Sequence, residues 1–421
     1  MDPAARAGTG SSVDEDGGVH LRTGRVLASG LLCLALTACS SGSGGRGAAS
    51  GSSTTAADTS ASQSSGPASS ASSASPQEAS VDRVLGELDL RARVSQLFLV
   101  GVPLDDLGTA DAVVRSGAGG VFLAGRSQAS AGELAGIARR WQSEAPGPAL
   151  WVAVDQEGGK VQSLKGPGFA RLPSAVAQGA LPNDQLAALA GGVGAALHGA
   201  GINLNLAPVA DVVPAGTEHD NAPIGFYDRQ YGSTAAAVAE DAGTVVDGLA
   251  HAGVTATLKH FPGLGRVRGN PDTQAGVTDP VTAADDDQVA AFGTLARSPA
   301  HPFVMVSSAT YPRIDPANQA MFSRAVLTGL LREQLSFEGV IVSDDVGEAE
   351  AVQGIPAGQR AVRFLRAGGT MVLTVTPDDV PAMVDEVVRT SQGDAAFART
   401  VDAAVRTALL AKAEAGLLPS G

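Results

Sequence analysis

The segment Val254-Thr-Ala-Thr-Leu-Lys-His-Phe-Pro-Gly263 decides the fold, because Lys259 and His260 close a run of β-branched and small apolar residues. A second segment, Gly339-Val-Ile-Val-Ser-Asp-Asp345, has the same form. Charges at the end of a buried strand are costly unless they are paired or used. Active-site residues occupy that position in a (β/α)8 barrel. The two segments therefore predict one pocket that holds a lysine, a histidine and two aspartates.

The rest of the folded region has the periodicity of a barrel. Short apolar runs alternate with Ala- and Leu-rich helical stretches. We expect strands at 95–101, 119–124, 149–155, 202–209, 255–260, 303–307, 340–344 and 371–375. We expect helices at 132–144, 184–200, 234–252, 324–334 and 358–367. Eight βα units in about 340 residues predict an α/β fold, a (β/α)8 TIM barrel forming a single catalytic domain.

A doubly wound open sheet is the alternative fold. That fold would need a Gly-rich phosphate loop after its first strand, and Gly101-Val-Pro-Leu-Asp105 is not such a loop.

The composition restricts the partners. The 421 residues include 29 Lys+Arg and 43 Asp+Glu, for a net charge of −14, and 44% are hydrophobic. An acidic chain with 4% aromatic residues argues against nucleic acid as a partner. The two cysteines, Cys33 and Cys39, precede the folded region, which excludes a disulfide framework and a thiolate metal site there. The six histidines lack metalloprotease spacing, so we expect no metal.

Residues 1–39 are predicted to be a signal peptide. Two arginines precede the apolar run 26–38, which is too short to span a bilayer but suits a signal peptide. The run ends in Leu36-Thr-Ala-Cys39, which resembles a bacterial lipobox, in which the cysteine becomes the lipidated first residue. An ordinary cleaved signal with an incidental cysteine is the alternative. The polar residues at the start are explained if translation begins near Val19.

Residues 40–80 are almost wholly Ser, Gly, Ala and Thr, a composition that cannot bury enough apolar surface to fold. We expect this segment to be a flexible tether and residues 81–421 to be the catalytic domain. The chain is thus predicted to be an exported lipoprotein, anchored on the extracytoplasmic face of the cell membrane.

Other strand ends also carry polar side chains. Asp155 and Glu157 close the third strand ahead of two glycines, and suggest a clamp for sugar hydroxyls; acidic residues on a helix N-terminus are the alternative. Arg229, in the loop after the fourth strand, is expected to hold a substrate oxygen, or else to form a solvated surface ion pair. Lys259 either donates to hydroxyl groups or forms a Schiff base, as in barrel aldolases.

Five motifs in this order resemble those of glycoside hydrolase family 3. They are Gly119-Gly-Val-Phe-Leu123, Asp155–Gly159, Ala207-Pro-Val-Ala-Asp211, Lys259–Gly263 and Ser343-Asp344-Asp345. Within that family the chain is similar to single-barrel bacterial β-N-acetylglucosaminidases, including lipid-anchored exported ones, over residues 85–380. The resemblance implies a hydrolase that removes terminal GlcNAc from peptidoglycan fragments or chitooligosaccharides, with no need for a metal or organic cofactor. The sequence leaves the oligomeric state open, and we expect a monomer.

The same resemblance implies a role for each site residue. Asp344 would be the nucleophile of a retaining mechanism. The residues that would hold the sugar are Asp155, Arg229, Lys259 and His260. Two other functions stay open: a β-glucosidase-type member of the family, and a non-catalytic saccharide-binding lipoprotein. The acceptor, water or phosphate, also stays open.

The chain departs from the family pattern at the general acid/base. The usual loop reads Gly-His-Gly and then Asp-x-His, whereas here Leu264 replaces the first histidine, and Asn270 and Asp272 replace the later pair. Three interpretations follow: Asp272 is the acid/base, Glu218 or His219 serves instead, or the enzyme is slow or non-catalytic. We expect Asp272, because a carboxylic acid does this work in most glycosidases.

Overall fold

The computed structural model describes residues 75–418, so the predicted signal peptide, Cys39 and most of the tether lie outside the described residues. Helix α1 (Pro76–Glu87) begins within the last five residues of the predicted tether. Its first turn is held by a capping box, in which Ser75 and Glu78 each accept the other's backbone N–H. In the part of the chain that is described, no helix has the length and apolar character needed to cross a membrane.

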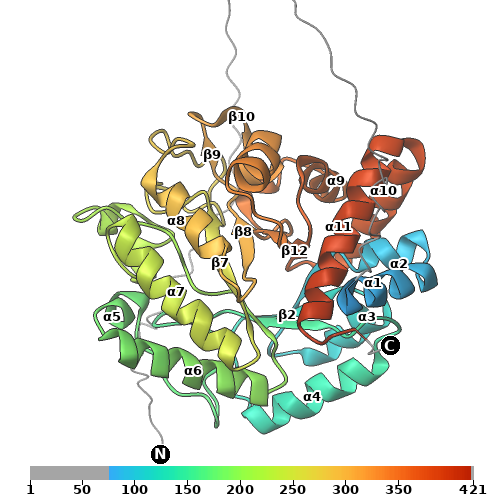
Figure 1. The fold of residues 1–421 in the computed structure, drawn as a ribbon, viewed down its shortest axis with the longest axis horizontal. Helices are drawn as coiled ribbons and strands as arrows, with labels where there is room; N and C mark the ends of the chain where they lie inside the picture. The colour runs from blue at the N-terminus through green and yellow to red at the C-terminus, as the bar shows by residue number, and fades with distance from the viewer. Residues whose placement is uncertain (1–74, 419–421) are drawn as a thin grey trace, which may run out of the picture. The chain divides into compact units, whose positions relative to one another are not determined.

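Eight parallel strands form the predicted barrel (Figure 1). They are β1 (Phe98–Pro103), β2 (Gly120–Ala124), β3 (Trp151–Val154), β6 (Leu204–Asn205), β7 (Thr255–Phe261), β8 (Phe303–Val306), β11 (Ile341–Ser343) and β12 (Val372–Thr374). Successive strands pair in parallel, and β1 pairs with β12. A bridge between Val342 and Met371, together with the N–H of Ser343 donating to the Met371 carbonyl, closes the ring.

Strand β6 is shorter than the predicted 202–209. Regular pairing ends at Asn205, and beyond it the chain keeps separate hydrogen bonds to β7 through the carbonyls of Ala207 and Pro208 and the N–H of Ala210. Pro208 has no N–H to donate to a regular ladder.

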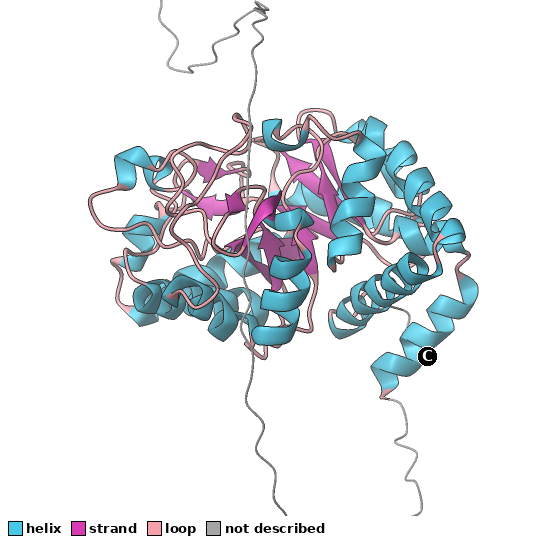
Figure 2. Cartoon of the chain, turned by 90° about the horizontal axis from the view of Figure 1, so that it is seen from above, coloured by secondary structure: helices cyan, strands magenta, loops and turns pink. Residues whose placement is uncertain are grey.

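Helices surround the strands and complete the βα units (Figure 2). Those that follow barrel strands are α3 (Ala110–Arg115), α4 (Ala131–Glu144), α6 (Asn183–Gly199), α7 (Ala235–His251), α8 (Asp287–Ala296), the π-helix η5 (Ala325–Gln334), α9 (Ala357–Ala367) and α10 (Val380–Gly393). The remaining helices are α2 (Leu90–Ser95), α5 (Ala175–Gly179) and α11 (Ala395–Glu414), of which α11 packs on α1. The five helices expected from the sequence are confirmed, with ends shifted by one residue.

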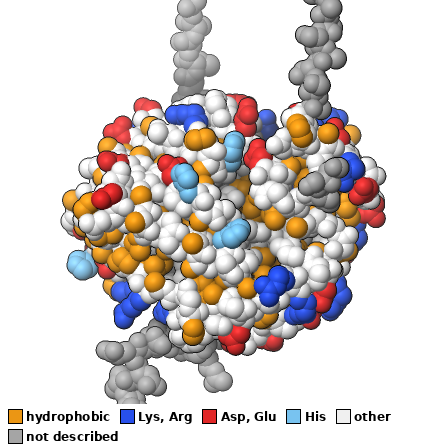
Figure 3. Space-filling view, turned by 60° about the horizontal axis from the view of Figure 1, so that its bottom comes forward, with side chains coloured by type: hydrophobic (Ala, Val, Ile, Leu, Met, Phe, Trp, Pro, Cys, Tyr) orange, Lys and Arg blue, Asp and Glu red, His pale blue; other side chains and the backbone are white. Residues whose placement is uncertain are grey.

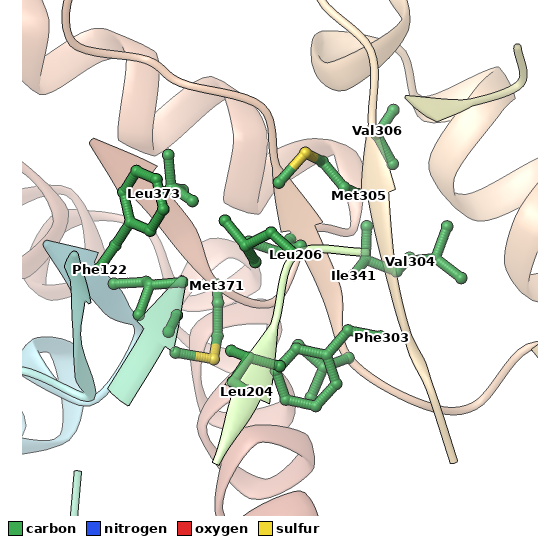
Figure 4. Packing of buried hydrophobic residues seen from close by; sticks show 14 of the residues in the cluster. Phe122, Leu204, Leu206, Phe303, Val304, Met305, Val306, Ile341, Met371 and Leu373 are labelled. Atoms are coloured by element: carbon green, nitrogen blue, oxygen red, sulfur yellow. The ribbon is translucent and has the colours of Figure 1, made fainter. Parts of the chain in front are cut away.

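Two hairpins extend the loops at the carboxyl-terminal ends of the barrel strands. Strands β4 (Gln156–Gly158) and β5 (Val161–Gln162) follow β3, and β9 (Thr310–Tyr311) and β10 (Asp315–Gln319) follow β8. Below them the barrel interior is filled with large apolar side chains from different strands (Figure 4). This packing makes the barrel a solid core, so a ligand can enter only among the loops at its mouth.

Helix α11 carries a buried cation, Lys412. Its side chain is 0% exposed, and its Nζ donates to Gln96 Oε1 over 2.8 Å rather than to a carboxylate. Burial lowers the pKa of Lys412 from 10.5 to about 7. Between these two values the unfolded chain binds a proton that the native state does not, so the free energy of unfolding should rise from pH 7 to pH 10.

We therefore expect Lys412→Met to raise the free energy of unfolding at pH 7 by about 1–3 kcal/mol, after the loss of the bond to Gln96. Urea denaturation at pH 7 and pH 9 measures the free energy of unfolding. In the variant this free energy should no longer include the increase with pH that Lys412 contributes. The exposed Lys165→Met is the matched control and should change neither quantity. A less stable Lys412→Met protein with an unchanged pH dependence would contradict this account.

Candidate active site

A cavity of about 360 Å³ lies at the carboxyl-terminal ends of the barrel strands. Its apolar floor is formed by Phe122, Leu206, Met305 and Leu373, which lie together in Figure 4. The six residues predicted to act on substrate all line it: Asp155, Arg229, Lys259, His260, Asp272 and Asp344. The structure thus brings these six residues together from both halves of the chain.

Lys259, in β7, is a fully paired cation. Its Nζ lies 2.7 Å from both Asp155 Oδ1 and Glu157 Oε1, and its side chain is 4% exposed. Burial alone would lower the pKa of Lys259, but the two carboxylates raise it above its usual value. A Schiff base needs a neutral amine. The buried, paired ammonium therefore favours Lys259 as a hydrogen-bond donor over a Schiff-base nucleophile.

Glu157 does not belong to the expected clamp for sugar hydroxyls, because its carboxylate is already paired. Arg229 donates to Glu157 from Nε (2.9 Å) and Nη2 (2.7 Å), and Lys259 forms an ion pair with the same carboxylate. Burial opposes ionisation, yet these two cations lower the pKa of Glu157 to about 2. Its oxygens are occupied and buried, and it lies in strand β4 rather than at a helix N-terminus. Glu157 therefore positions the two cations and is not available to a sugar hydroxyl.

Arg229 is held in a buried pair, which overturns the alternative of a solvated surface ion pair. The side chains of Arg229 and Glu157 are 15% and 5% exposed. The Nη1 of Arg229 also donates to the Pro223 carbonyl over 2.8 Å. Three of the five N–H groups of the guanidinium are used in these bonds, so two remain for a ligand in the cavity.

His260 is oriented by Asp211, a residue to which the sequence gave no role. Its Nδ1 lies 2.7 Å from Asp211 Oδ2, while Asp211 Oδ1 accepts the backbone N–H groups of His260 (3.1 Å) and Leu264 (2.7 Å). A carboxylate only accepts, so Nδ1 carries the hydrogen and Nε2 is left for the cavity. The signal for this role was present in the sequence, because a buried aspartate at a strand end needs partners.

Two consecutive aspartates follow β11, and the structure separates their roles. Asp345 accepts backbone N–H groups from Gly347, Glu348, Ala349 and Val375 at 2.7–3.1 Å. Asp345 therefore holds the loop together. Within residues 75–418, Asp344 accepts only from the N–H of Asp345, at 2.9 Å, and it lines the cavity. Of the two, Asp344 is the carboxylate free to react.

The pKa of Asp344 depends on its burial and on the charges around it. Burial, and next the negative charge of Asp272, raise the pKa of Asp344 from 3.8 to about 6, against an opposing effect of His260. Both carboxylates line the same cavity, so the charge of Asp272 opposes ionisation of Asp344.

The loop that carries Asp272 is fixed to the loop after β11. The carbonyls of Asp272 and Pro271 accept N–H groups from Glu350 (3.0 Å) and Ala351 (3.1 Å). The N–H of Asp272 donates to Asn270 Oδ1 over 3.1 Å. These bonds engage only the backbone of Asp272, so its exposed carboxylate faces the cavity without a hydrogen-bond partner in the described chain.

The alternative acid/base residues lie elsewhere. Neither Glu218 nor His219 lines the cavity that contains Asp344. Backbone N–H groups, its own and that of Gly216, lower the pKa of Glu218, which makes it a weaker proton-holding group. Geometry thus favours Asp272 over both.

Two other properties bear on ligands. Residues 75–418 contain no group of three or more His, Cys, Asp or Glu side chains arranged to hold a metal ion. On the face drawn in Figure 3, basic and acidic side chains are interspersed among hydrophobic and uncharged ones.

Known proteins share this architecture. The family described as Glycosyl hydrolase family 3 N terminal domain matches residues 89–409. The structure of a beta-N-acetylhexosaminidase from Beutenbergia cavernae superposes with a TM-score of 0.74 at 46% identity, over 77% of this chain and 98% of that one. Beta-hexosaminidase LpqI from Mycobacterium tuberculosis is 33% identical over 310 residues, which are 71% of this chain and 76% of LpqI.

Proposed function

The chain belongs to glycosyl hydrolase family 3, and from that premise we propose that it is a retaining, exo-acting β-N-acetylglucosaminidase. It releases terminal β-linked GlcNAc from peptidoglycan fragments or chitooligosaccharides. The observation that carries the proposal is one cavity in which Asp344, a second carboxylate without a hydrogen-bond partner among the described residues, and the ion-paired Lys259 and Arg229 meet. The relatives named beta-hexosaminidase or beta-N-acetylhexosaminidase support the sugar specificity.

The two carboxylates divide the chemistry. Asp344 attacks the anomeric carbon as Asp272 gives its proton to the leaving oxygen, so the glycosidic bond breaks and a glycosyl-enzyme ester forms. Asp272 then takes a proton from a water molecule, which attacks the same carbon and releases Asp344. Both substitutions invert the anomeric centre, so the product retains the β configuration.

The remaining groups hold the terminal sugar. Lys259 uses two N–H groups on carboxylates and has a third for a hydroxyl oxygen, and Arg229 has two. Asp155 uses Oδ1 on Lys259, which leaves Oδ2 as an acceptor. His260 offers Nε2. Bonds from these fixed groups accelerate the reaction to the extent that they strengthen as the ring flattens in the transition state.

A panel of aryl β-glycosides, assayed with and without phosphate, tests this function. We expect release of the aryl group from the β-GlcNAc derivative and little from the β-glucoside. Equal rates on both sugars would indicate a β-glucosidase, and absence of turnover on every substrate would indicate a non-catalytic saccharide-binding protein. A sugar phosphate as product would identify phosphate rather than water as the acceptor.

The pH dependence of kcat/KM should report the ionisation of Asp344. Asp344 must be ionised to attack, so on an activated aryl glycoside, whose cleavage does not need a proton from Asp272, kcat/KM should fall about tenfold per pH unit below an apparent pKa of about 6. Since Asp272 raises the pKa of Asp344, Asp272→Asn should move this acidic limb to lower pH, measured with an activated aryl glycoside that needs little acid catalysis. An acidic limb that stays in place in Asp272→Asn would refute the coupling of the two carboxylates.

We also propose that the protein is an exported lipoprotein, anchored through Cys39 to the extracytoplasmic face of the membrane and acting as a monomer. The support is the Leu36-Thr-Ala-Cys39 sequence behind a short apolar run. A single chain supplies all six residues assigned to the cavity, which supports the monomer.

Cys39→Ala should move the protein from the membrane fraction to the soluble fraction, because the lipid acceptor is lost. Fractionation followed by immunoblotting measures this. A truncated protein that begins at Ser75 keeps the capping box of α1 and should retain the full activity of the soluble form. A Cys39→Ala protein that stays in the membrane fraction would show that the anchor lies elsewhere.

A further inference from the structure

An exposed apolar group lies beside the cavity. Among residues 75–418, four large hydrophobic side chains are exposed, and three of them belong to this group: Val176, Phe226 and Tyr227. The rings of Phe226 and Tyr227 meet edge to face with centroids 5.2 Å apart. The N–H of Val176, in α5 at the left of Figure 1, donates to the carbonyl of Asp228, the residue after Tyr227. The same loop contributes Pro223 and Arg229 to the cavity wall.

One cation, Lys160, lies over these rings, and two more follow in the adjoining loops. The Nζ of Lys160, between β4 and β5, lies 5.2 Å from the ring centroid of Phe226 and 5.3 Å from that of Tyr227. Arg126 donates from Nη2 to the Lys160 carbonyl over 3.0 Å. Arg171 precedes Leu172, whose carbonyl accepts the N–H of Gly159 beside Lys160. We call the six residues of the two groups the rim patch: Arg126, Lys160, Arg171, Val176, Phe226 and Tyr227.

The charge of the rim patch is opposite to that of the chain. The sequence contains no acidic residue between Glu157 and Asp184, although the chain as a whole has a net charge of −14. None of the three cations of the patch forms an ion pair with any described residue. Asp228 is the exposed acid beside it, and Glu157 is buried and already paired. The excess of positive charge next to exposed rings indicates an anionic ligand that also has apolar faces.

The backbone of the loop that carries the two rings is held in place by Asn221. Asn221 fixes the loop by donating from Nδ2 to the carbonyls of Leu264 (2.7 Å) and Val267 (2.8 Å), and its Oδ1 accepts the N–H of Gly225 at 2.7 Å. The N–H of Phe226 donates to the Asn221 carbonyl over 3.0 Å. A surface that is already ordered loses little conformational entropy on binding, which favours a role in recognition.

We infer that the rim patch binds a glycan strand that carries carboxylate groups, next to the catalytic cavity. The rings of Phe226 and Tyr227 offer flat surfaces to the C–H faces of sugars, and Lys160 and Arg171 offer partners to carboxylates. This inference rests on the proposed function for its choice of a glycan. It adds a second recognition site, which distinguishes acidic strands from neutral chitooligosaccharides at a place where no residue takes part in the chemistry.

Two hexasaccharides provide matched probes: a hyaluronan fragment, which alternates GlcNAc with glucuronate, and chitohexaose, which lacks carboxylates. Fluorescence anisotropy of each labelled probe is measured with excess free GlcNAc present to occupy the cavity. The wild-type protein should bind the hyaluronan probe at least about tenfold more tightly than chitohexaose at low salt. The difference should shrink as salt screens the cations.

Two double variants test the patch, Phe226→Ala/Tyr227→Ala and Lys160→Ala/Arg171→Ala. Each should weaken hyaluronan binding by about tenfold. Each should also leave kcat/KM on an aryl β-GlcNAc substrate within about twofold, since none of these side chains lines the cavity. Val281→Ala removes the fourth exposed hydrophobic side chain and Arg115→Ala an exposed cation on α3, and as controls both should bind as the wild type does.

Binding of the hyaluronan probe that is unchanged in both double variants, or no stronger than that of chitohexaose, would overturn the inference. The aryl β-GlcNAc assay separates this result from a failure of the proposed function. Patch-dependent binding in a protein that does not cleave the aryl substrate would support the rim patch and refute the enzyme. Cleavage of the aryl substrate without patch-dependent binding would support the enzyme and refute the rim patch.

Discussion

Asp344→Asn should lower kcat by about 10⁴-fold or more on both an aryl β-GlcNAc and a GlcNAc disaccharide, because an amide cannot serve as the covalent nucleophile. Asparagine keeps the size of the side chain and its acceptor for the Asp345 N–H, so the loss should be in chemistry and not in folding. Steady-state kinetics together with thermal denaturation measure both quantities. The thermal midpoint should fall little.

Asp345→Asn is the matched control, because it changes the neighbouring carboxylate in the same way. This carboxylate accepts four backbone N–H groups, so its replacement should lower the thermal midpoint while leaving measurable turnover. If Asp345→Asn abolishes turnover and Asp344→Asn does not, the two roles are reversed.

Asp272→Ala should affect two substrates differently. A poor leaving group needs a proton from the general acid, so cleavage of a GlcNAc disaccharide should fall by about 10²–10⁴-fold. An activated aryl glycoside needs little such help, so its bond should still break. The glycosyl-enzyme should then accumulate, because the base that activates water is also missing. Azide needs no base, so it should restore aryl-glycoside turnover and give a β-glycosyl azide.

The control for this experiment is Glu218→Ala, which removes a carboxylate outside the cavity and should leave both substrates and the azide effect unaltered. Equal losses of activity on both substrates in Asp272→Ala, without rescue by azide, would show that Asp272 is not the general acid/base. Glu348, an exposed carboxylate that also lines the cavity, would be the next residue to test.

The barrel could be predicted because its strands are buried on both faces and therefore appear as continuous apolar runs separated by helical periodicity. All eight expected strands are present. The error at β6 is local: the apolar run continues past Asn205, but the regular register of the ladder does not, and Pro208 in that run has no N–H to donate. The π-helical character of η5 depends on packing around it, and the sequence predicted only a helix there.

The site could be predicted as a set of residues, but not as a set of contacts. Position at strand ends was enough to place Lys259 and Asp344 in one cavity. The function of Glu157 depends on Arg229, 72 residues later in the chain, and that of Asp211 on His260, 49 residues later. Such pairs form only when the fold brings distant segments together, so sequence spacing gave Glu157 the wrong role and Asp211 none.

The central claim is that Asp344 forms a covalent bond to the sugar. Mass spectrometry of the protein after inactivation by an activated fluorosugar derived from GlcNAc tests it most directly. We predict a single added sugar on the peptide that contains Asp344, and none in Asp344→Asn. A label on another residue would contradict the claim. So would a protein that turns over the substrate yet never forms an adduct, because the acetamide of the substrate would then be the nucleophile.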